Sequence, residues 1–178
     1  LKVGRTQMQD AVPMTLGQEF HGWATTISED IDRLIEVQKL VLELNLGGTA
    51  IGTGINAHPD YSAAVVPHLR KITGRDDIVG ASDLIEATSD TGVFMSVSSV
   101  MKRAAMKLSK ICNDLRLLSS GPQAGFNEIN LPARQAGSSI MPGKVNPVIP
   151  EAVSQVAYVV AGNDVTCLLY TSDAADDS

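Results

Sequence analysis

A glycine- and proline-rich stretch late in the chain, residues 137–147, gathers the side chains most suited to chemistry. Ser138 and Ser139 supply hydroxyl groups. Lys144 and Asn146 follow a Pro-Gly turn with an ammonium group and an amide. Together with backbone N–H groups, such a set suits recognition of a small carboxylate and stabilisation of extra negative charge on it. The alternative is a polar surface loop without chemistry, and composition alone leaves both open.

A phosphate-binding loop is excluded by spacing. Gly143-Lys144 resembles the end of a P-loop, but five residues separate Gly137 from Gly143 where that motif has four. Val145 also stands where the motif needs a Ser or Thr for magnesium. A second glycine cluster, residues 47–54, follows a predicted helix rather than a strand, so it does not fit a dinucleotide-binding turn.

Long helices are needed to position the serine-rich loop. Residues 15–44 open with Thr15 and Gln18 at capping-box spacing, and apolar residues then recur about every 3.5 positions. A helix over this run is about 43 Å long at ~1.5 Å per residue, so it needs long partners packed nearly parallel to it.

Two further helical segments are predicted. One runs from Asp83 to Leu118, with Glu86 placed for a capping-box-like contact. The other covers residues 148–160 and is apolar on most sides, which indicates burial inside a bundle. The fold class is therefore all-α, an elongated helical bundle.

Two stretches between the helices, residues 47–80 and 119–150, lose the helical period and are predicted to be loops. The second contains the serine-rich segment and is too long for a simple connector. Long ordered loops of this kind are usually functional, so we interpret residues 119–150 as a catalytic loop.

Composition narrows the classes of partner. The net charge is −6, and without the three acids of residues 167–178 it is 14 − 17 = −3, with no basic cluster for nucleic acid or anionic membrane. No uninterrupted apolar run is long enough to span a bilayer and the first residues lack signal-peptide order, so we expect a cytoplasmic protein. The scattered histidines and two cysteines predict no metal site and no disulfide framework.

The chain is interpreted as an internal piece of a larger protein. Its first residues lack an initiator Met and start inside a motif, and residues 1–166 read as part of one helical domain. Residues 167–178 look like translated adapter sequence and are interpreted as a non-native tail. The alternative is a genuine acidic C-terminus.

The serine-rich segment resembles the signature of the fumarase/aspartase superfamily, G-S-x-x-M-x-x-K-x-N. It is matched by Gly137, Ser138, Met141, Lys144 and Asn146. The similarity also covers residues 4–11, 15–19, 48–54 and 109–117, and in effect it extends from Leu1 to about Thr166.

Three places are more similar to the aspartase branch than to fumarases. They are Gln7, the segment 84–90, and the segments 145–151 and 162–164. This resemblance implies reversible elimination of ammonia from L-aspartate to give fumarate, without an organic cofactor. It also implies a homotetramer in which segments of three subunits form each active site.

The resemblance assigns roles to residues of this chain. Ser138 is the expected base, and Lys144 and Asn146 are expected to hold substrate carboxylate oxygens. Thr6 and Gln7 are expected to contact the substrate from another segment, unless they form only a capped turn before the first helix. Ser139 and Glu151 are expected to support these groups without contacting the substrate. For Glu151 the reason is that Gln7 cannot form the charged pair that a histidine at that position makes with this glutamate in relatives.

Two alternatives remain open. The first is a class II fumarase, a hydratase that uses the same loop. The second is a non-catalytic helical relic. In either case the chain is too short to be expected to work alone.

Overall fold

The computed structural model describes residues 1–173, with side chains described through residue 169. The chain divides into two compact units, residues 1–32 with 102–161 and residues 33–101 with 162–178. The three long helices contribute residues to both units. They are α1 (Leu16–Gln38), α4 (Gly92–Leu118) and α5 (Val148–Asp173).

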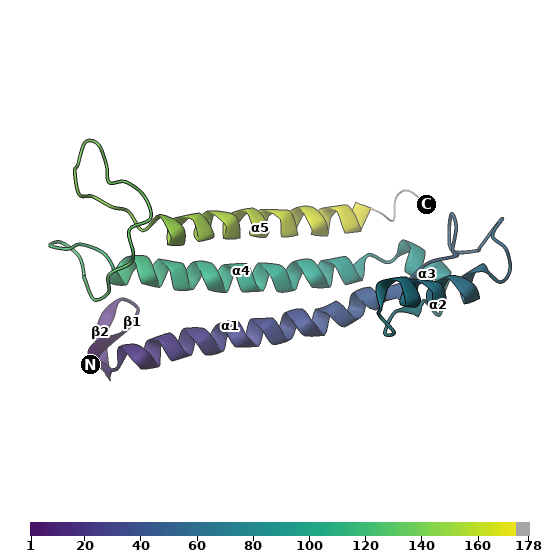
Figure 1. Cartoon of the computed structure of the whole chain (residues 1–178), viewed down its shortest axis with the longest axis horizontal. Coiled ribbons are helices and arrows are strands. Elements are labelled where there is room, and N and C mark those ends of the chain that lie inside the picture. Colours follow the sequence, from purple (N-terminus) through teal and green to yellow (C-terminus); the bar gives the residue numbers. More distant parts are fainter. Residues whose placement is uncertain (174–178) are drawn as a thin grey trace. The chain divides into compact units, whose positions relative to one another are not determined.

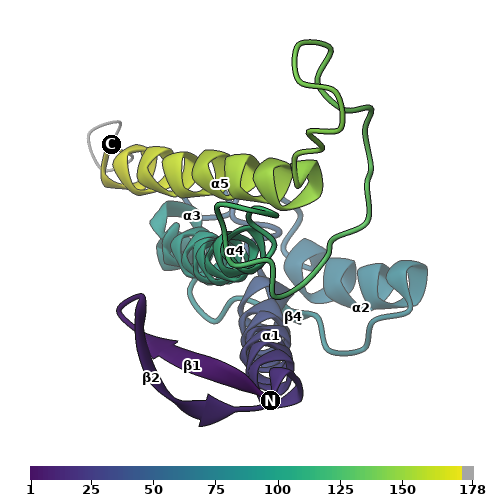
Figure 2. The ribbon, with the colours of Figure 1, turned by 90° about the vertical axis from the view of Figure 1, so that its left-hand side faces the viewer.

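The first unit begins with an antiparallel hairpin of β1 (Lys2–Thr6) and β2 (Gln9–Met14), which pairs Lys2 with Met14 and Thr6 with Gln9. Figure 2 shows this hairpin beside the first turns of α1. Thr15 then caps α1 as predicted. Its backbone N–H donates to Gln18 Oε1 at 2.9 Å, and the Gln18 N–H donates to Thr15 Oγ1 at 3.1 Å, a complete capping box.

Within the first unit, α4 lies between α1 and α5 (Figure 1). Asp30 of α1 is buried and faces two cations of α4, Arg103 Nε at 3.2 Å and Lys107 Nζ at 3.1 Å. Because a buried carboxylate is costly unless it is paired, these contacts fix how α4 packs on α1 in this unit. The irregular segment 119–147 then joins α4 to α5.

The second unit holds the short elements. They are a 3-10 helix (Lys39–Leu42), β3 (Glu43–Leu44), α2 (Tyr61–Thr73), β4 (Val79–Gly80) and α3 (Leu84–Ser89). β3 and β4 pair in parallel, Glu43 opposite Val79 and Leu44 opposite Gly80. The prediction of a helical bundle is confirmed, with these small sheets added to it.

Several predicted boundaries are wrong. The first helix ends at Gln38 rather than Leu44, because the chain tightens into the 3-10 helix and then pairs with β4. The second helical run is interrupted at Asp90, which has extended dihedrals and whose Oδ1 accepts the Gly92 N–H at 3.0 Å, starting α4 afresh. The start of that run is confirmed, since Asp83 Oδ1 accepts the N–H groups of Ile85 and Glu86.

The predicted loop 47–80 is also wrong in part, because it contains α2. This helix carries Pro67 in its interior and ends at Gly74 in the left-handed conformation. Proline and glycine marked the segment as a break in the sequence, whereas here Gly74 is the ordinary C-terminal cap of a helix.

The helix α5 begins at Val148 as predicted and continues to Asp173, so residues 167–173 of the predicted non-native tail are helical. The rest of that tail, residues 174–178, lies outside the described residues. Whether the tail is foreign stays a prediction.

By length and composition, residues Val148–Leu169 of α5 are long and apolar enough to cross a membrane. This segment contains Glu151 and Asp164, so it is not an uninterrupted apolar run. Its apolar run is broken by polar residues, among them buried Ser154 and Asp164, whose Oδ1 accepts a hydrogen bond from Ser98 Oγ at 2.8 Å. In the single chain most of this helix is exposed, so the predicted burial of residues 148–160 inside a bundle is not found within the described residues.

Candidate active site

Ser138 lies in a loop that folds back on itself. Its N–H donates to the Lys144 carbonyl at 3.1 Å, and the Lys144 N–H donates to the Met141 carbonyl at 3.0 Å. Gly143 has a φ of 83°, a backbone conformation that favours glycine, and it closes the turn between them. Residues 138–144 therefore form a compact ring whose geometry is set by its own backbone.

The hydroxyl oxygen of Ser138 accepts hydrogen bonds from within this ring. Its Oγ accepts the N–H of Ile140 at 3.3 Å and the N–H of Met141 at 3.1 Å. Hydrogen bonds donated to an oxygen favour its negatively charged form. Negative charge on the Ser138 Oγ would therefore be stabilised by these two donors.

A cavity of about 750 Å³ opens beside this loop in the first unit. Among the predicted site residues, Lys144, Asn146 and Glu151 line it together. Ser138 and Ser139 do not line it, although Lys144 belongs to the same ring as Ser138. The ammonium, the amide and the glutamate therefore lie around one cavity, while the roles predicted for them stay predictions.

The lining residues that were not predicted as site residues include the polar side chains of Arg116, Asn127 and Asn130. Arg116 Nη2 lies 3.9 Å from Glu151 Oε1, and its Nη1 donates to Asn113 Oδ1 at 3.2 Å. The available signal was position, because Arg116 is in the last turn of α4, immediately before the irregular segment 119–147.

The pairing of Arg116 with Glu151 matters for the charge of the cavity. Gln7 cannot neutralise Glu151, whereas the guanidinium of Arg116 offsets its charge from the neighbouring helix. With Lys144 added, the named ionisable side chains of the cavity carry one net positive charge. A site of that sign suits a small anion.

Thr6 and Gln7 lie at the tip of the β1–β2 hairpin and are exposed. Gln7 has a φ of 51° and Met8 a φ of 64°, the positive pair that two-residue type I′ hairpin turns require. Neither residue lines the cavity of Lys144. The alternative of a capped turn is replaced by a tight hairpin turn of two non-glycine residues.

An ionic cluster anchors the base of this hairpin. Arg5 and Lys2 of β1 both pair with Glu128, from the irregular segment after α4. The hydrogen bond from Arg5, followed by the pairing with Lys2, holds the pKa of the Glu128 carboxyl below its usual value despite its partial burial. Glu128 is therefore ionised across the neutral range.

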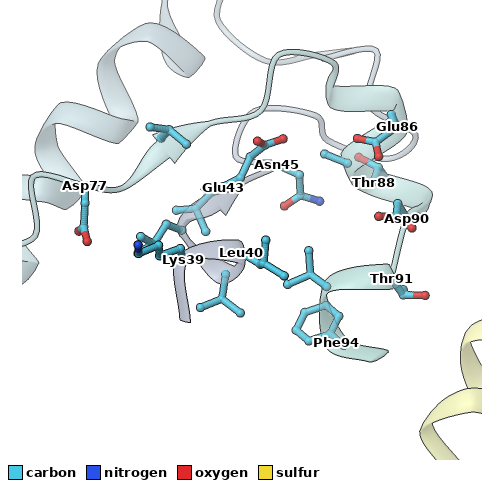
Figure 3. A pocket seen from close by; sticks show the side chains of 16 residues that line it. Lys39, Leu40, Glu43, Asn45, Asp77, Glu86, Thr88, Asp90, Thr91 and Phe94 are labelled. Atoms are coloured by element: carbon cyan, nitrogen blue, oxygen red, sulfur yellow. The ribbon is translucent and has the colours of Figure 1, made fainter. Parts of the chain in front are cut away.

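The second unit contains a cavity of about 760 Å³ between the 3-10 helix, β3, α3 and the start of α4. Figure 3 shows Glu43, Glu86 and Asp90 around it with Lys39. None of the predicted site residues lines this cavity. Over residues 1–173, no group of three His, Cys, Asp or Glu side chains is placed to hold a metal ion.

A family model described as lyase matches residues 1–162, and the chain belongs to this family. Among curated proteins, it is 66% identical over 170 residues to an aspartate ammonia-lyase of Pseudomonas aeruginosa, covering 95% of this chain and 36% of that protein. It is 60% identical over 166 residues to an aspartate ammonia-lyase of Escherichia coli, covering 93% of this chain and 34% of that protein.

Solved structures agree with this assignment. A fumarate lyase/delta crystallin from Brucella melitensis bound to cobalt matches with a TM-score of 0.91 at 57% identity, covering 96% of this chain and 37% of that one. A class II fumarase from Schistosoma mansoni matches with a TM-score of 0.92 at 35% identity, covering 97% of this chain and 39% of that one. The chain spans about a third of the length of the curated relatives it matches.

Proposed function

We propose that the complete protein containing this chain is a carbon–nitrogen lyase that reversibly eliminates ammonia from L-aspartate to give fumarate. The observation that carries the proposal is the Ser138 hydroxyl with two backbone N–H donors on its Oγ. Sequence identity of 60–68% to several aspartate ammonia-lyases supports the choice of substrate.

The chemical difficulty is a weakly acidic C–H bond beside a carboxylate. Ser138, as the alkoxide, takes the proton from that carbon, and the electron pair moves onto the adjacent carboxylate as a second negative charge. The pair then returns to form the carbon–carbon double bond while the C–N bond breaks and ammonia leaves. Catalysis requires that this dianionic state be stabilised more than the bound substrate.

Lys144 and Asn146 are proposed to hold the carboxylate that receives the extra charge. An ammonium group and an amide at a closed, dry site strengthen their hydrogen bonds as charge develops. Support comes from their common position on the cavity wall beside the Ser138 ring. Ser139 and Glu151 are proposed to support this arrangement without contacting the reacting carbon.

Thr6 and Gln7 are proposed to bind substrate in a site completed by other copies of the chain. They lie on a hairpin tip and do not line the cavity of Lys144. A homotetramer, in which one copy's hairpin meets another copy's loop, accounts for both observations. Exposed apolar residues of α5 that share one face in the first unit, Ile149, Val156 and Val159, would be covered in such an assembly.

The isolated chain is proposed to be inactive, and the complete enzyme to reside in the cytoplasm. A class II fumarase is the second candidate, favoured by the structural match to the Schistosoma mansoni enzyme. The two differ in the group that leaves, ammonia or water.

Fumarate absorbance separates the candidates. The complete protein is assayed with L-aspartate and, in a parallel experiment, with L-malate. Fumarate formed from L-aspartate supports the proposal, and fumarate formed only from L-malate supports the hydratase. Failure with both substrates would indicate a helical relic without activity.

A further inference from the structure

Glu128 connects the hairpin to the irregular segment 119–147, which also carries the Ser138 ring. Its Oε1 accepts a hydrogen bond from Arg5 Nη2, and its Oε2 lies 3.1 Å from Lys2 Nζ. Lys2 also pairs with Glu19 in the first turn of α1. One carboxylate thus joins β1 to the segment after α4, and Lys2 extends the connection to α1.

These contacts are shielded from water more than ordinary surface ion pairs. The side chains of Lys2, Arg5 and Glu128 are 9%, 19% and 21% exposed. The Arg5 guanidinium also stacks over the Phe126 ring, 4.1 Å from its centroid. A planar cation held by a carboxylate on one side and an aromatic ring on the other has little freedom to move.

The other groups around Arg5 contribute less. Asp10 Oδ1 lies 3.9 Å from Arg5 Nε, and its side chain is 81% exposed. Glu128 is therefore the main anion that fixes Arg5. Removing its carboxylate would take away the main anionic partner of Arg5 and one of the two anionic partners of Lys2.

Arg5 is followed directly by the hairpin tip, where Gln7 and Met8 both have positive φ. Non-glycine residues disfavour this conformation and keep it only where surrounding contacts impose it. The tip itself is exposed, and the nearest partly buried side chain of β1 is that of Arg5, which lies opposite Asp10 in the hairpin. The ion pair of Arg5 with Glu128 is therefore the contact closest to the tip that links the hairpin to another segment.

We propose that Glu128 is a positioning residue that holds the hairpin tip, with Thr6 and Gln7, in its substrate-binding conformation. The expected change in KM rests on the proposed function, whereas the expected change in the order of the hairpin does not. Glu128 acts through Arg5 and contacts no substrate. It also makes the hairpin and the catalytic loop of one chain depend on a common contact.

Glu128→Gln in the complete protein tests the proposal. The variant keeps the size and one acceptor oxygen of the side chain but removes its charge. Amide hydrogen exchange over residues 2–14 is expected to accelerate about tenfold. The KM for L-aspartate is expected to rise roughly tenfold while kcat changes less than about twofold, as for lost substrate binding.

Two further variants serve as controls. Glu128→Asp keeps the charge on a shorter side chain, so its KM is expected to lie between those of the parent and Glu128→Gln. Asp77→Asn removes the carboxylate from another Arg–carboxylate ion pair, in which Arg75 Nη2 lies 2.8 Å from Asp77 Oδ2 in the second unit. This variant is expected to change neither the hydrogen exchange of residues 2–14 nor the KM.

The outcomes separate this proposal from the proposed function. Unchanged exchange over residues 2–14 would overturn the positioning role whether or not the complete protein acts on L-aspartate. Faster exchange with an unchanged KM would also overturn it, because the contact would then be structural only. A parent protein that ignores L-aspartate would contradict the proposed function, with the exchange experiment still judging Glu128.

Discussion

The Oγ of Ser138 accepts the backbone N–H of Met141 at 3.1 Å, three residues further along the same loop. This contact places a fixed donor on the atom that must carry negative charge if Ser138 is a base. The donor belongs to the main chain, so every substitution of Met141 other than proline retains it. Side chains around the ring and the hairpin therefore provide tests of the site in addition to Ser138 itself.

Arg116 is expected to offset the charge of Glu151 in the cavity. Arg116→Gln should raise the KM for L-aspartate about fivefold, since an uncompensated carboxylate repels a dicarboxylate substrate. In a Glu151→Gln background the same substitution should have less than about half that effect. Lys110→Gln, which removes a cation paired with Asp114 on the same helix, is the matched control.

Equal effects of Arg116→Gln in both backgrounds would contradict this role. Steady-state kinetics on the four combinations of Arg116 and Glu151 variants measure the coupling directly.

The hairpin tip should gain stability from glycine at Met8. Met8 has a φ of 64° and a side chain that is 65% exposed, so its loss removes strain and little packing. Met8→Gly is expected to raise the free energy of unfolding by about 1 kcal/mol, net of glycine's extra freedom in the unfolded chain. Met8→Ala, which keeps the Cβ, should give no such gain in denaturant unfolding, and equal effects of the two variants would count against backbone strain.

Stability should depend on pH through Glu128. Its pKa is lowered in the folded protein, chiefly by the hydrogen bond from Arg5, from an unfolded value of about 4.3. The ion pairs contribute fully above that value and are lost as the pH falls through the folded pKa. The pKa values of Lys2 and Arg5 are raised, so both partners stay protonated throughout.

The free energy of unfolding should therefore differ between the parent and Glu128→Gln by about 1 kcal/mol at neutral pH. That difference should shrink toward zero in acid. Denaturant unfolding at a series of pH values measures it, and a difference independent of pH would show that the charge of Glu128 is not what stabilises the hairpin.

Assembly should depend on the apolar face of α5. Val159 is 62% exposed in the single chain and shares a face with Val156. Val159→Glu would place a charge in the proposed subunit contact, so the complete protein should elute as smaller species in size-exclusion chromatography with light scattering. A tetramer that survives Val159→Glu would place the contact elsewhere.

Much of the fold was predictable because its signals are local. The capping box at Thr15, the cap at Asp83 and the start of α5 each depend on residues within one helical turn, and all three are confirmed. The end of α1 was not, because the pairing of β3 with β4 joins segments more than thirty residues apart. Apolar periodicity continues across that boundary and gives no sign of it.

The candidate site, like the fold, was predictable where its signals are local in sequence. The motif around Ser138 marked the ring, while its two backbone donors could not be inferred from side-chain types. Glu128 and Arg116 were missed because their partners, Arg5 and Glu151, are distant in sequence. Ion pairs of this kind leave no spacing that a single sequence can display.

The most direct measurement of the central claim is fumarate formation from L-aspartate by the complete protein and by its Ser138→Ala variant, with Ser139→Ala as the control. Loss of the base should lower kcat by about 10³-fold or more, with the oligomer and succinate binding preserved. Ser139→Ala should retain most activity. Turnover by Ser138→Ala at the parent rate would contradict the assignment of Ser138 as the base.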